Sequence, residues 1–340
     1  MGCDAPASDL ILRSARLEGW PRVVIVALAL LFSANLARAQ TDEYPSRTVT
    51  FICPFPAGGG TDQIARIVAK GLSERLGQQV VVENRGGANG GLGAQEVMRA
   101  DPDGYTIGAI SDSPMTVNPW MYEKLAYRPL QDFIAVARIN HFPSLLVAHP
   151  SVPVKTVADL IKLAKEKPGT LNYSSGGVGN FSHLGLAVLA FKTGINIVHV
   201  PYRGVGPGTQ AIVAGDVQLM YNNIATALPQ VEASKLTGIA VGGEQRFPAL
   251  ANVPTIAETV PGFDVTPWVG IFVPAKTPKE VVARLSKEVD ALLKDPEVIK
   301  IFQTNMIKAS YLDSEPFTRQ IQKETDDWEK VIKSLNIKAD

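Results

Sequence analysis

The stretch that most constrains the fold is a glycine-rich turn between an apolar strand and a helix. Residues 49–52 form a short apolar run, residues 58–60 are three consecutive glycines, and apolar residues then recur at helical spacing from Ile64 to Leu76. The first N–H groups of such a helix lack partners within it, and the helix dipole favours negative charge. We therefore expect a compact anion, a carboxylate or a phosphate, to bind at this turn without any Lys or Arg.

The N-terminal segment has the pattern of a secretory signal peptide. Arg residues precede an apolar run at residues 23–32, and Ala37 and Ala39 provide small residues before Gln40. A membrane-spanning helix needs about 20 apolar residues, about twice the length of this run. We expect residues 1–39 to be removed and the mature protein to be periplasmic.

The composition excludes several classes of function. The chain carries 33 basic and 33 acidic residues without a basic tract, which disfavours nucleic-acid binding. Only Cys53 remains after the signal peptide, so no intrachain disulfide is expected, and the four His are scattered. The sequence lacks the Lys of a phosphate-binding loop. We predict no metal site, no cofactor and no nucleotide hydrolysis.

Strand and helix patterns alternate along the chain and then restart, which predicts two doubly wound α/β domains. We predict domain 1 at residues 40–140 plus 265–340 and domain 2 at residues 141–264. The chain would cross between them twice, near residues 139–143 and 262–272. We expect the C-terminal helices to pack on domain 1. Two crossovers flanking a cleft suit closure around a small ligand.

Small, polar or glycine-rich residues follow five of the predicted strands. These turns lie at residues 56–61, 111–113, 174–180, 202–206 and 221–223. In open α/β sheets, ligands bind beyond the carboxyl ends of the strands, so the turns are predicted to line the cleft. We predict that Thr61 or Asp62 caps the helix after the first turn.

The candidate ligand-binding residues come from these turns and their neighbours. For Ser111 and Ser113 a helix-capping role is the alternative, and for His183 it is a place on the surface. Arg203 is a candidate bidentate clamp on a second carboxylate, against the alternative of a solvated loop Arg. The full set is Phe55, Ala57, Gly58, Gly59, Thr61, Asp62, Ser111, Ser113, Ser174, Ser175, Gly179, Asn180, Ser182, His183, Tyr202, Arg203 and Asn222.

Several motifs in a fixed order resemble one family. They are found at residues 54–62, 81–88, 102–106, 173–179 and 200–204. Together they resemble the Bug (TctC-like) family, the periplasmic solute-binding proteins of tripartite tricarboxylate transporters. The resemblance implies a Venus-flytrap receptor without enzymatic activity, which we expect to be a monomer. It would capture a small organic carboxylate and deliver it to the membrane permease.

The resemblance also implies where the ligand sits. Residues 57–62 would hold its carboxylate from one side and residues 174–182 from the other. Two Asn at positions 222 and 223 offer no counter-charge to a ligand amine. Phe55, Phe181 and Trp268 are candidate walls for an aromatic ligand, with packing between the domains as the alternative. Together with the two Asn and a Tyr, these candidates favour a dicarboxylate or an aromatic carboxylate over an amino acid.

Two other functions are compatible with the pattern. A secreted Ser hydrolase would need a nucleophile elbow or a recognisable Ser–His pair, and the sequence signals neither. A sensor that presents its bound ligand to a signalling partner would use the same pocket as a transport receptor.

Overall fold

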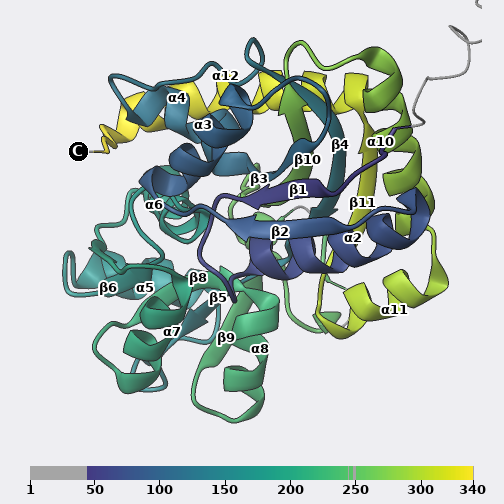
Figure 1. Cartoon of the computed structure of the whole chain (residues 1–340). Coiled ribbons are helices and arrows are strands. Elements are labelled where there is room, and N and C mark those ends of the chain that lie inside the picture. Colours follow the sequence, from purple (N-terminus) through teal and green to yellow (C-terminus); the bar gives the residue numbers. More distant parts are fainter. Residues whose placement is uncertain (1–43, 244, 248–249, 340) are drawn as a thin grey trace, which may run out of the picture. The chain divides into compact units, whose positions relative to one another are not determined.

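The computed structural model describes residues 44–243, 245–247 and 250–339. The predicted signal peptide at residues 1–39 lies outside this range. Two β-sheets form the framework, and helices cover both faces of each sheet (Figure 1). In the described residues, no helix is long and apolar enough to cross a membrane.

The first sheet has six strands in the order β11-β4-β10-β3-β1-β2. Their bounds are β1 Val49–Cys53, β2 Val80–Asn84, β3 Thr106–Ser111, β4 Phe133–His141, β10 Trp268–Pro274 and β11 Lys308–Asp313. Strands β2, β1 and β3 are parallel, as their alternation with helices predicted. Strand β10, from the C-terminal part of the chain, lies between β3 and β4 and runs antiparallel to both.

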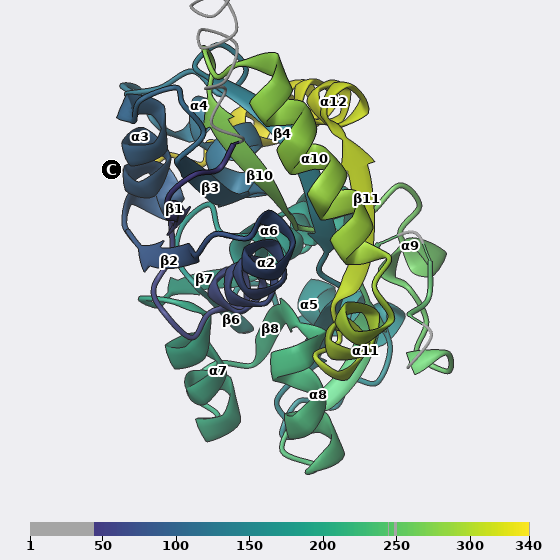
Figure 2. The same ribbon diagram turned by 45° about the vertical axis from the view of Figure 1, so that its right-hand side comes forward.

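Helices pack on both faces of the first sheet (Figure 2). On one face, α2 (Gly60–Leu76) packs against α10 (Lys279–Leu293), close enough that a Cβ at Gly71 would overlap Leu292. On the other face, α3 (Gly91–Arg99) and α12 (Ser314–Leu335) share one apolar core with Trp268 and Phe272. The shorter elements are η1 Ala88–Gly90, η2 Ser113–Val117, α4 Asn118–Met121 and α11 Pro296–Thr304.

The second sheet has five strands in the order β7-β6-β8-β5-β9. They are β5 Ser144–Ala148, β6 Asn172–Ser175, β7 Val198–Pro201, β8 Leu219–Asn223 and β9 Thr237–Val241. One core joins it to α5 (Val157–Glu166), α6 (Phe181–Thr193) and α9 (Ile256–Thr259). Another core joins its other face to α7 (Val205–Ala214) and α8 (Ile224–Glu232). Helix α5 begins after Thr156, which caps it and forms a capping box with Asp159.

Two crossovers connect the sheets, which confirms the predicted fold class. The chain leaves β4 at His141 and enters β5 at Ser144, and it returns between β9 and β10. The crossovers are hydrogen-bonded to each other, because the Phe142 N–H donates to the Pro267 carbonyl at 2.8 Å. The Tyr221 hydroxyl also donates to the Val265 carbonyl at 2.7 Å, which holds the second crossover against β8.

Several local predictions were wrong or incomplete. Strands β4 and β11 were missed, because Arg138 and Asn140 interrupt the apolar run of β4 and β11 is a half-exposed edge strand. The apolar run of residues 80–82 suits a buried strand, but β2 lies at the other edge of the sheet, and Val81 is 45% exposed. Residues 221–223 were placed after a strand but lie within β8.

The C-terminal helices pack on the first sheet as predicted, but α12 also reaches the second one. Trp328 and Val331 of α12 pack against the core of the second sheet, next to α6. The last turns of α12 therefore contact elements of both sheets. The boundaries predicted for the two domains remain a prediction.

Candidate functional site

The N terminus of α2 presents unpaired N–H groups, as the glycine-rich turn predicted. The helix begins after Gly59, whose backbone is extended and which provides no side-chain cap. The predicted caps, Thr61 and Asp62, lie inside the first turn of the helix instead. Among the described residues, the N–H groups of Gly59, Gly60 and Thr61 have no acceptor. Ala57, Gly58 and Gly59 are exposed, so these donors face a region open to a ligand.

The side chain of Asp62 fixes the conformation of this turn. Its buried carboxylate accepts hydrogen bonds from the Gly58 N–H at 2.9 Å, Arg66 Nε at 3.0 Å and Asn84 Nδ2 at 2.8 Å. Asn84 also donates to the carbonyl of Phe55. Burial alone would raise the pKa of Asp62, but the hydrogen bonds from Arg66, Gly58 and Asn84 outweigh it and lower the pKa. Asp62 is thus an ionised anchor of the turn, and the Gly58 N–H that we expected to face an anion is already occupied.

Residues at or next to two of the other predicted turns, 111–113 and 221–223, lie near the first turn and its neighbours. A Cβ at Gly60 would lie 3.1 Å from the ring of Phe142, in the first crossover, and 3.4 Å from Asn223 Nδ2 at the end of β8. A Cβ at Gly90 would lie 3.0 Å from the ring of Phe55 and 2.6 Å from Pro114, which follows Ser113. Elements of both sheets therefore meet at the N terminus of α2.

The tip of the second turn, at residues 176–180, lies against α4 and η1, two short helices next to the first sheet. A Cβ at Gly179 would overlap the sulfur of Met121 and would lie 3.1 Å from Asn89 Nδ2. A Cβ at Gly176 would lie 3.1 Å from the N atom of Val205, the first residue of α7, and the Tyr202 N–H donates to the Ser175 carbonyl at 3.0 Å. The segments that follow β6 and β7 are therefore adjacent.

Protein side chains satisfy most N–H groups of this second turn. Ser175 Oγ accepts from Gly177 at 3.1 Å and Ser182 Oγ accepts from Gly176 at 2.9 Å. Asn180 caps α6 by accepting from the Ser182 N–H, and the fully buried Ser174 hydroxyl donates to the Gly208 carbonyl. These polar groups shape the turn, and their contact with a ligand stays a prediction.

His183 is buried against the turn. Its Nδ1 accepts from the Gly179 N–H at 3.1 Å, and its ring stacks on His199 with 3.9 Å between the centroids. His199 Nε2 lies 2.6 Å from Ser175 Oγ, and Tyr173 stacks on its ring. Burial, and to a smaller extent His199, lowers the pKa of His183 to about 3, and burial lowers that of His199 to about 4.

Sequence reasoning missed His199, and the two Asn at the end of β8 have different surroundings. His199 alternates with apolar residues in β7, and no local pattern pairs it with Ser175, 24 positions earlier. Asn222 was selected for ligand binding, but its fully buried amide donates to Thr209 Oγ1. Asn223 is the residue whose amide approaches Gly60.

The remaining candidates lie around the site. Ser111 and Ser113 are buried at the end of β3, and neither hydroxyl caps η2. Tyr202 is half-buried after β7, and Arg203 beside it is exposed. Trp268 is fully buried among Phe272 and Phe317, which makes it part of the core rather than a wall of the site.

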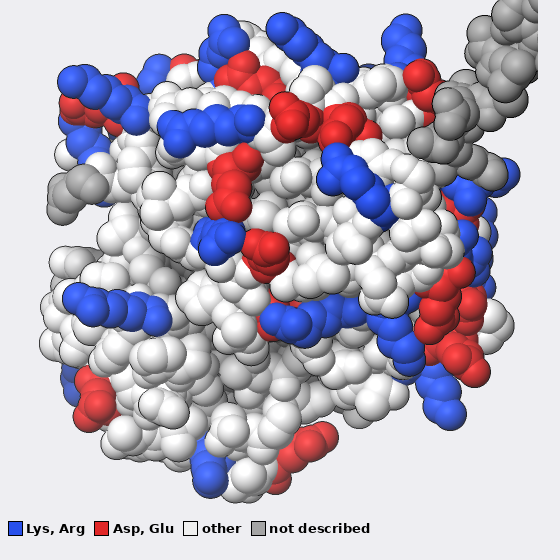
Figure 3. Space-filling view, viewed as in Figure 1, with Lys and Arg blue, Asp and Glu red and all other residues white. Residues whose placement is uncertain are grey.

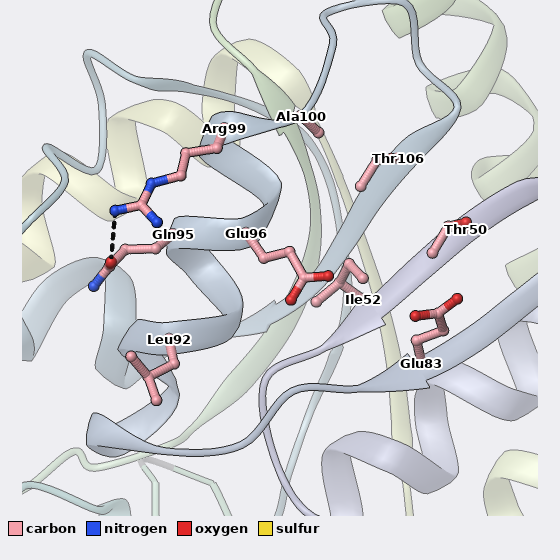
Figure 4. Close-up of a pocket in the computed structure, with 9 residues that line it drawn as sticks. All are labelled: Thr50, Ile52, Glu83, Leu92, Gln95, Glu96, Arg99, Ala100 and Thr106. Carbon is pink, nitrogen blue, oxygen red and sulfur yellow. Dashed lines mark hydrogen bonds between the residues drawn. The ribbon is translucent and has the colours of Figure 1, made fainter.

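A cavity of about 590 Å³ lies elsewhere, on the first sheet beside α3 (Figure 4). Its lining includes the carboxylates of Glu83 and Glu96, which both pair with Arg85. Two carboxylates bridged by one Arg leave little attraction for an anion. Positive and negative side chains are interspersed over this face, without an extended patch of either sign (Figure 3). We therefore place the candidate anion site at the turns.

Comparison with known proteins gives a consistent result. The model of the tripartite tricarboxylate transporter family receptors (TctC) matches residues 64–337. A UPF0065 protein from the tcbD-tcbE intergenic region of Pseudomonas sp. (strain P51) is 36% identical, covering 94% of this chain and 95% of its own. The protein BugT of Bordetella pertussis is 29% identical, covering 82% of this chain and 86% of its own.

Solved structures of similar proteins include two with a bound ligand named. An R. palustris protein with adipate has a TM-score of 0.81 and 34% identity, over 86% of this chain and 99% of its own. MatC from Rhodopseudomonas palustris with bound malate has a TM-score of 0.75 and 32% identity, over 85% of this chain and 100% of its own. The periplasmic binding protein BugD has a TM-score of 0.78 and 30% identity, over 87% of this chain and 99% of its own.

Proposed function

The chain belongs to the tripartite tricarboxylate transporter receptor (TctC) family of solute-binding proteins, and from this premise we propose that it captures a small dicarboxylate in the periplasm. The ligand would lie between two domains, residues 40–140 plus 265–340 and residues 141–264. The receptor would then deliver it to the membrane permease of its transporter. We further propose that the receptor acts as a monomer.

One observation carries the proposal, the cluster of N–H donors at the start of α2. Gly59, Gly60 and Thr61 offer three donors without acceptors in the described part of the chain. Hydrogen bonds to a charged acceptor are stronger than neutral ones, so a carboxylate gains most from such a cluster. The amide of Asn223, directed at Gly60, would complete the shell around the carboxylate.

The rest of the ligand would extend toward the second turn. Arg203 is exposed on the neighbouring turn and would pair with a second carboxylate. The two similar structures with named ligands contain adipate and malate, which are both dicarboxylates. Both observations favour a dicarboxylate over an aromatic monocarboxylate, which remains the alternative ligand class.

One contact in the structure supports the hydrolase alternative, but the burial of the candidate nucleophile opposes it. Ser175 Oγ contacts His199 Nε2, a pair that the sequence did not signal. However, Ser175 is fully buried, and its Oγ also accepts from the Gly177 N–H. A nucleophile must reach its substrate, so the geometry favours binding without turnover.

A ligand panel tests the proposal directly. The mature protein is unfolded and refolded to remove any co-purified ligand, and melting temperatures are then compared across mono-, di- and aromatic carboxylates. We expect dicarboxylates to stabilise the protein most, because a ligand that binds only the folded state raises its stability. Stabilisation by no carboxylate would refute the proposal. A transport assay in a strain that lacks this protein separates a transport role from a sensor role.

A further inference from the structure

The second turn is supported by two stacked histidines, His183 and His199. His183 accepts from the Gly179 N–H, and His199 contacts Ser175, which accepts from the Gly177 N–H. We propose that these two histidines are positioning residues, which hold residues 176–180 in their binding shape only while the imidazole ring of His183 is neutral. This inference rests on the proposed function, because it concerns how the same site is shaped. It assigns the histidines a role in the turn rather than in direct ligand contact.

The hydrogen bonds give each ring a defined task. For Nδ1 of His183 to accept from the Gly179 N–H, the neutral ring must carry its proton on Nε2. His199 Nε2 lies 2.6 Å from Ser175 Oγ, and the same oxygen accepts from the Gly177 N–H and lies 3.2 Å from the Gly177 carbonyl. The Gly179 N–H thus depends directly on an unprotonated imidazole nitrogen of His183, whereas His199 supports the turn through its contact with Ser175 and its stacking on His183.

The backbone of the turn explains why it needs this support. Gly177 and Gly179 both have positive φ angles, 125° and 76°. Glycine is flexible at such positions, so the conformation must be fixed by other contacts. Gly179 is also the residue that approaches Met121 of α4 and Asn89 of η1. A loosened turn would therefore lose its contact across the cleft.

The surroundings of His183 do not stabilise a charged ring. From β7 it faces His199, and from β6 it faces Tyr173. Met121 approaches the turn from α4 and Asn89 from η1, and α12 approaches the start of α6 through Trp328 and Ile332; all four side chains are uncharged. Among the described residues, His199 is the titratable neighbour that acts on His183, and it opposes protonation. Two charged rings stacked at 3.9 Å would repel each other.

The direction of the pH dependence follows from the lowered pKa values. The ordinary histidine pKa is 6.5, and in the folded protein His183 and His199 have pKa values of about 3 and about 4. An open or unfolded form with exposed rings therefore takes up protons first as the pH falls below 6.5. The closed turn is fully stable above that pH and loses stability progressively as the pH falls toward 4.

A measurement without ligand tests the turn itself. We would follow the amide signals of Gly177 and Gly179 by NMR in wild type and in His183→Phe, which keeps a stacked ring but removes the acceptor. We expect the Gly179 amide of the variant to lose its hydrogen-bonded shift and to exchange at least about tenfold faster, since the N–H then lacks a partner. An unchanged Gly179 amide in a folded variant would overturn the proposal.

Ligand affinity, with adipate as the probe, provides the second readout. His183→Asn places an amide oxygen close to the position of Nδ1 and does not titrate, whereas His183→Phe removes the acceptor. At pH 7.5 we expect His183→Phe to weaken binding about tenfold and His183→Asn by less than about threefold. Between pH 7.5 and 6.0 the wild type should lose about threefold more affinity than His183→Asn. His149→Asn, in the loop after β5, is the control and should behave as wild type.

The two proposals fail in different ways. If wild type binds no carboxylate, the proposed function fails, and the Gly177 and Gly179 amide signals still decide the role of the histidines. If wild type binds adipate but His183→Asn shows the same pH dependence as wild type, the neutral-ring requirement is wrong.

Discussion

The turn after β1 and the turn after β6 look alike in sequence but differ in their hydrogen bonding. Both place glycines between a strand and a helix. At the start of α2, three N–H groups have no acceptor among the described residues. At the start of α6, the side chains of Ser175, Ser182, Asn180 and His183 occupy the N–H groups of the turn. Among the described residues, the first turn therefore leaves N–H donors available to an anion, whereas side chains occupy the corresponding donors of the second turn.

The difference arises from where the polar side chains stand. In the first turn, the carboxylate of Asp62 supports the turn from within the helix and takes only the Gly58 N–H. In the second turn, polar residues both precede and follow the glycines, and their side chains accept hydrogen bonds from the N–H groups of the turn. We infer that the first turn binds the ligand and that the second completes the cleft around it.

The largest effect is expected from Gly60→Val. A side chain there would press on the Phe142 ring and the Asn223 amide, where a Cβ already lies 3.1 Å and 3.4 Å away. Overpacking of this size costs about 1–3 kcal/mol, which, if expressed fully in binding, corresponds to an affinity loss of about 5- to 150-fold. Isothermal titration with adipate measures it. Gly206→Val in α7, where a Cβ meets open space, is the control. Equal losses of affinity in both variants would show that the first turn has no special role in binding.

Asp62→Ala tests the support beneath the first turn. It leaves the Gly58 N–H and the Asn84 amide without their acceptor in a buried position. We expect a loss of about 2 kcal/mol in the free energy of unfolding, together with weaker binding. Urea denaturation checks the first effect. A variant with wild-type stability would show that the turn does not depend on this carboxylate.

Asn223→Asp tests which Asn faces the ligand. An Asp keeps the cap on α8, where Asn223 Oδ1 accepts from the Ala225 N–H, but adds a negative charge beside Gly60. We expect adipate to bind about tenfold more weakly, as a result of repulsion at short range. Asn223→Ser, which can cap without a charge, should lose less. Asn222→Ala should mainly lower stability, because it removes the donor to Thr209.

The smallest effect is expected from Arg203→Ala. An exposed ion pair contributes about 0.2–1 kcal/mol, so affinity for a dicarboxylate should fall by less than about fivefold. A monocarboxylate of similar length should bind equally well to the variant and to wild type. If both ligands lose affinity equally, Arg203 is not a clamp on a second carboxylate.

Much of the fold could be predicted because local signals and tertiary structure agreed. The parallel order of β1, β2 and β3, the Thr156 cap and the two crossovers all follow from patterns within short windows. Strand β4 escaped because Arg138 and Asn140 are buried polar residues held by distant partners, Ser310 on β11 and the Val269 N–H on β10. No window around β4 contains those partners.

For the candidate site, the sequence predicted which segments take part but not which atoms of those segments contact one another. The sequence located the turns, but the partner of each N–H group depends on contacts made after folding. His199 meets Ser175 through strand pairing, and Asn223 meets Gly60 across two sheets. For the same reason Asp62 and Asn222 were predicted to face the ligand, whereas folding gives their side chains protein partners.

The most direct test of the central claim is an NMR titration of the backbone amides with adipate. We predict that the Gly59, Gly60 and Thr61 amide protons shift downfield and become protected from exchange, as N–H groups that gain a carboxylate acceptor do. The Gly177 and Gly179 amides, which already have acceptors, should change much less. Saturable binding that leaves the Gly59, Gly60 and Thr61 signals in place would contradict the assignment of the first turn as the carboxylate site.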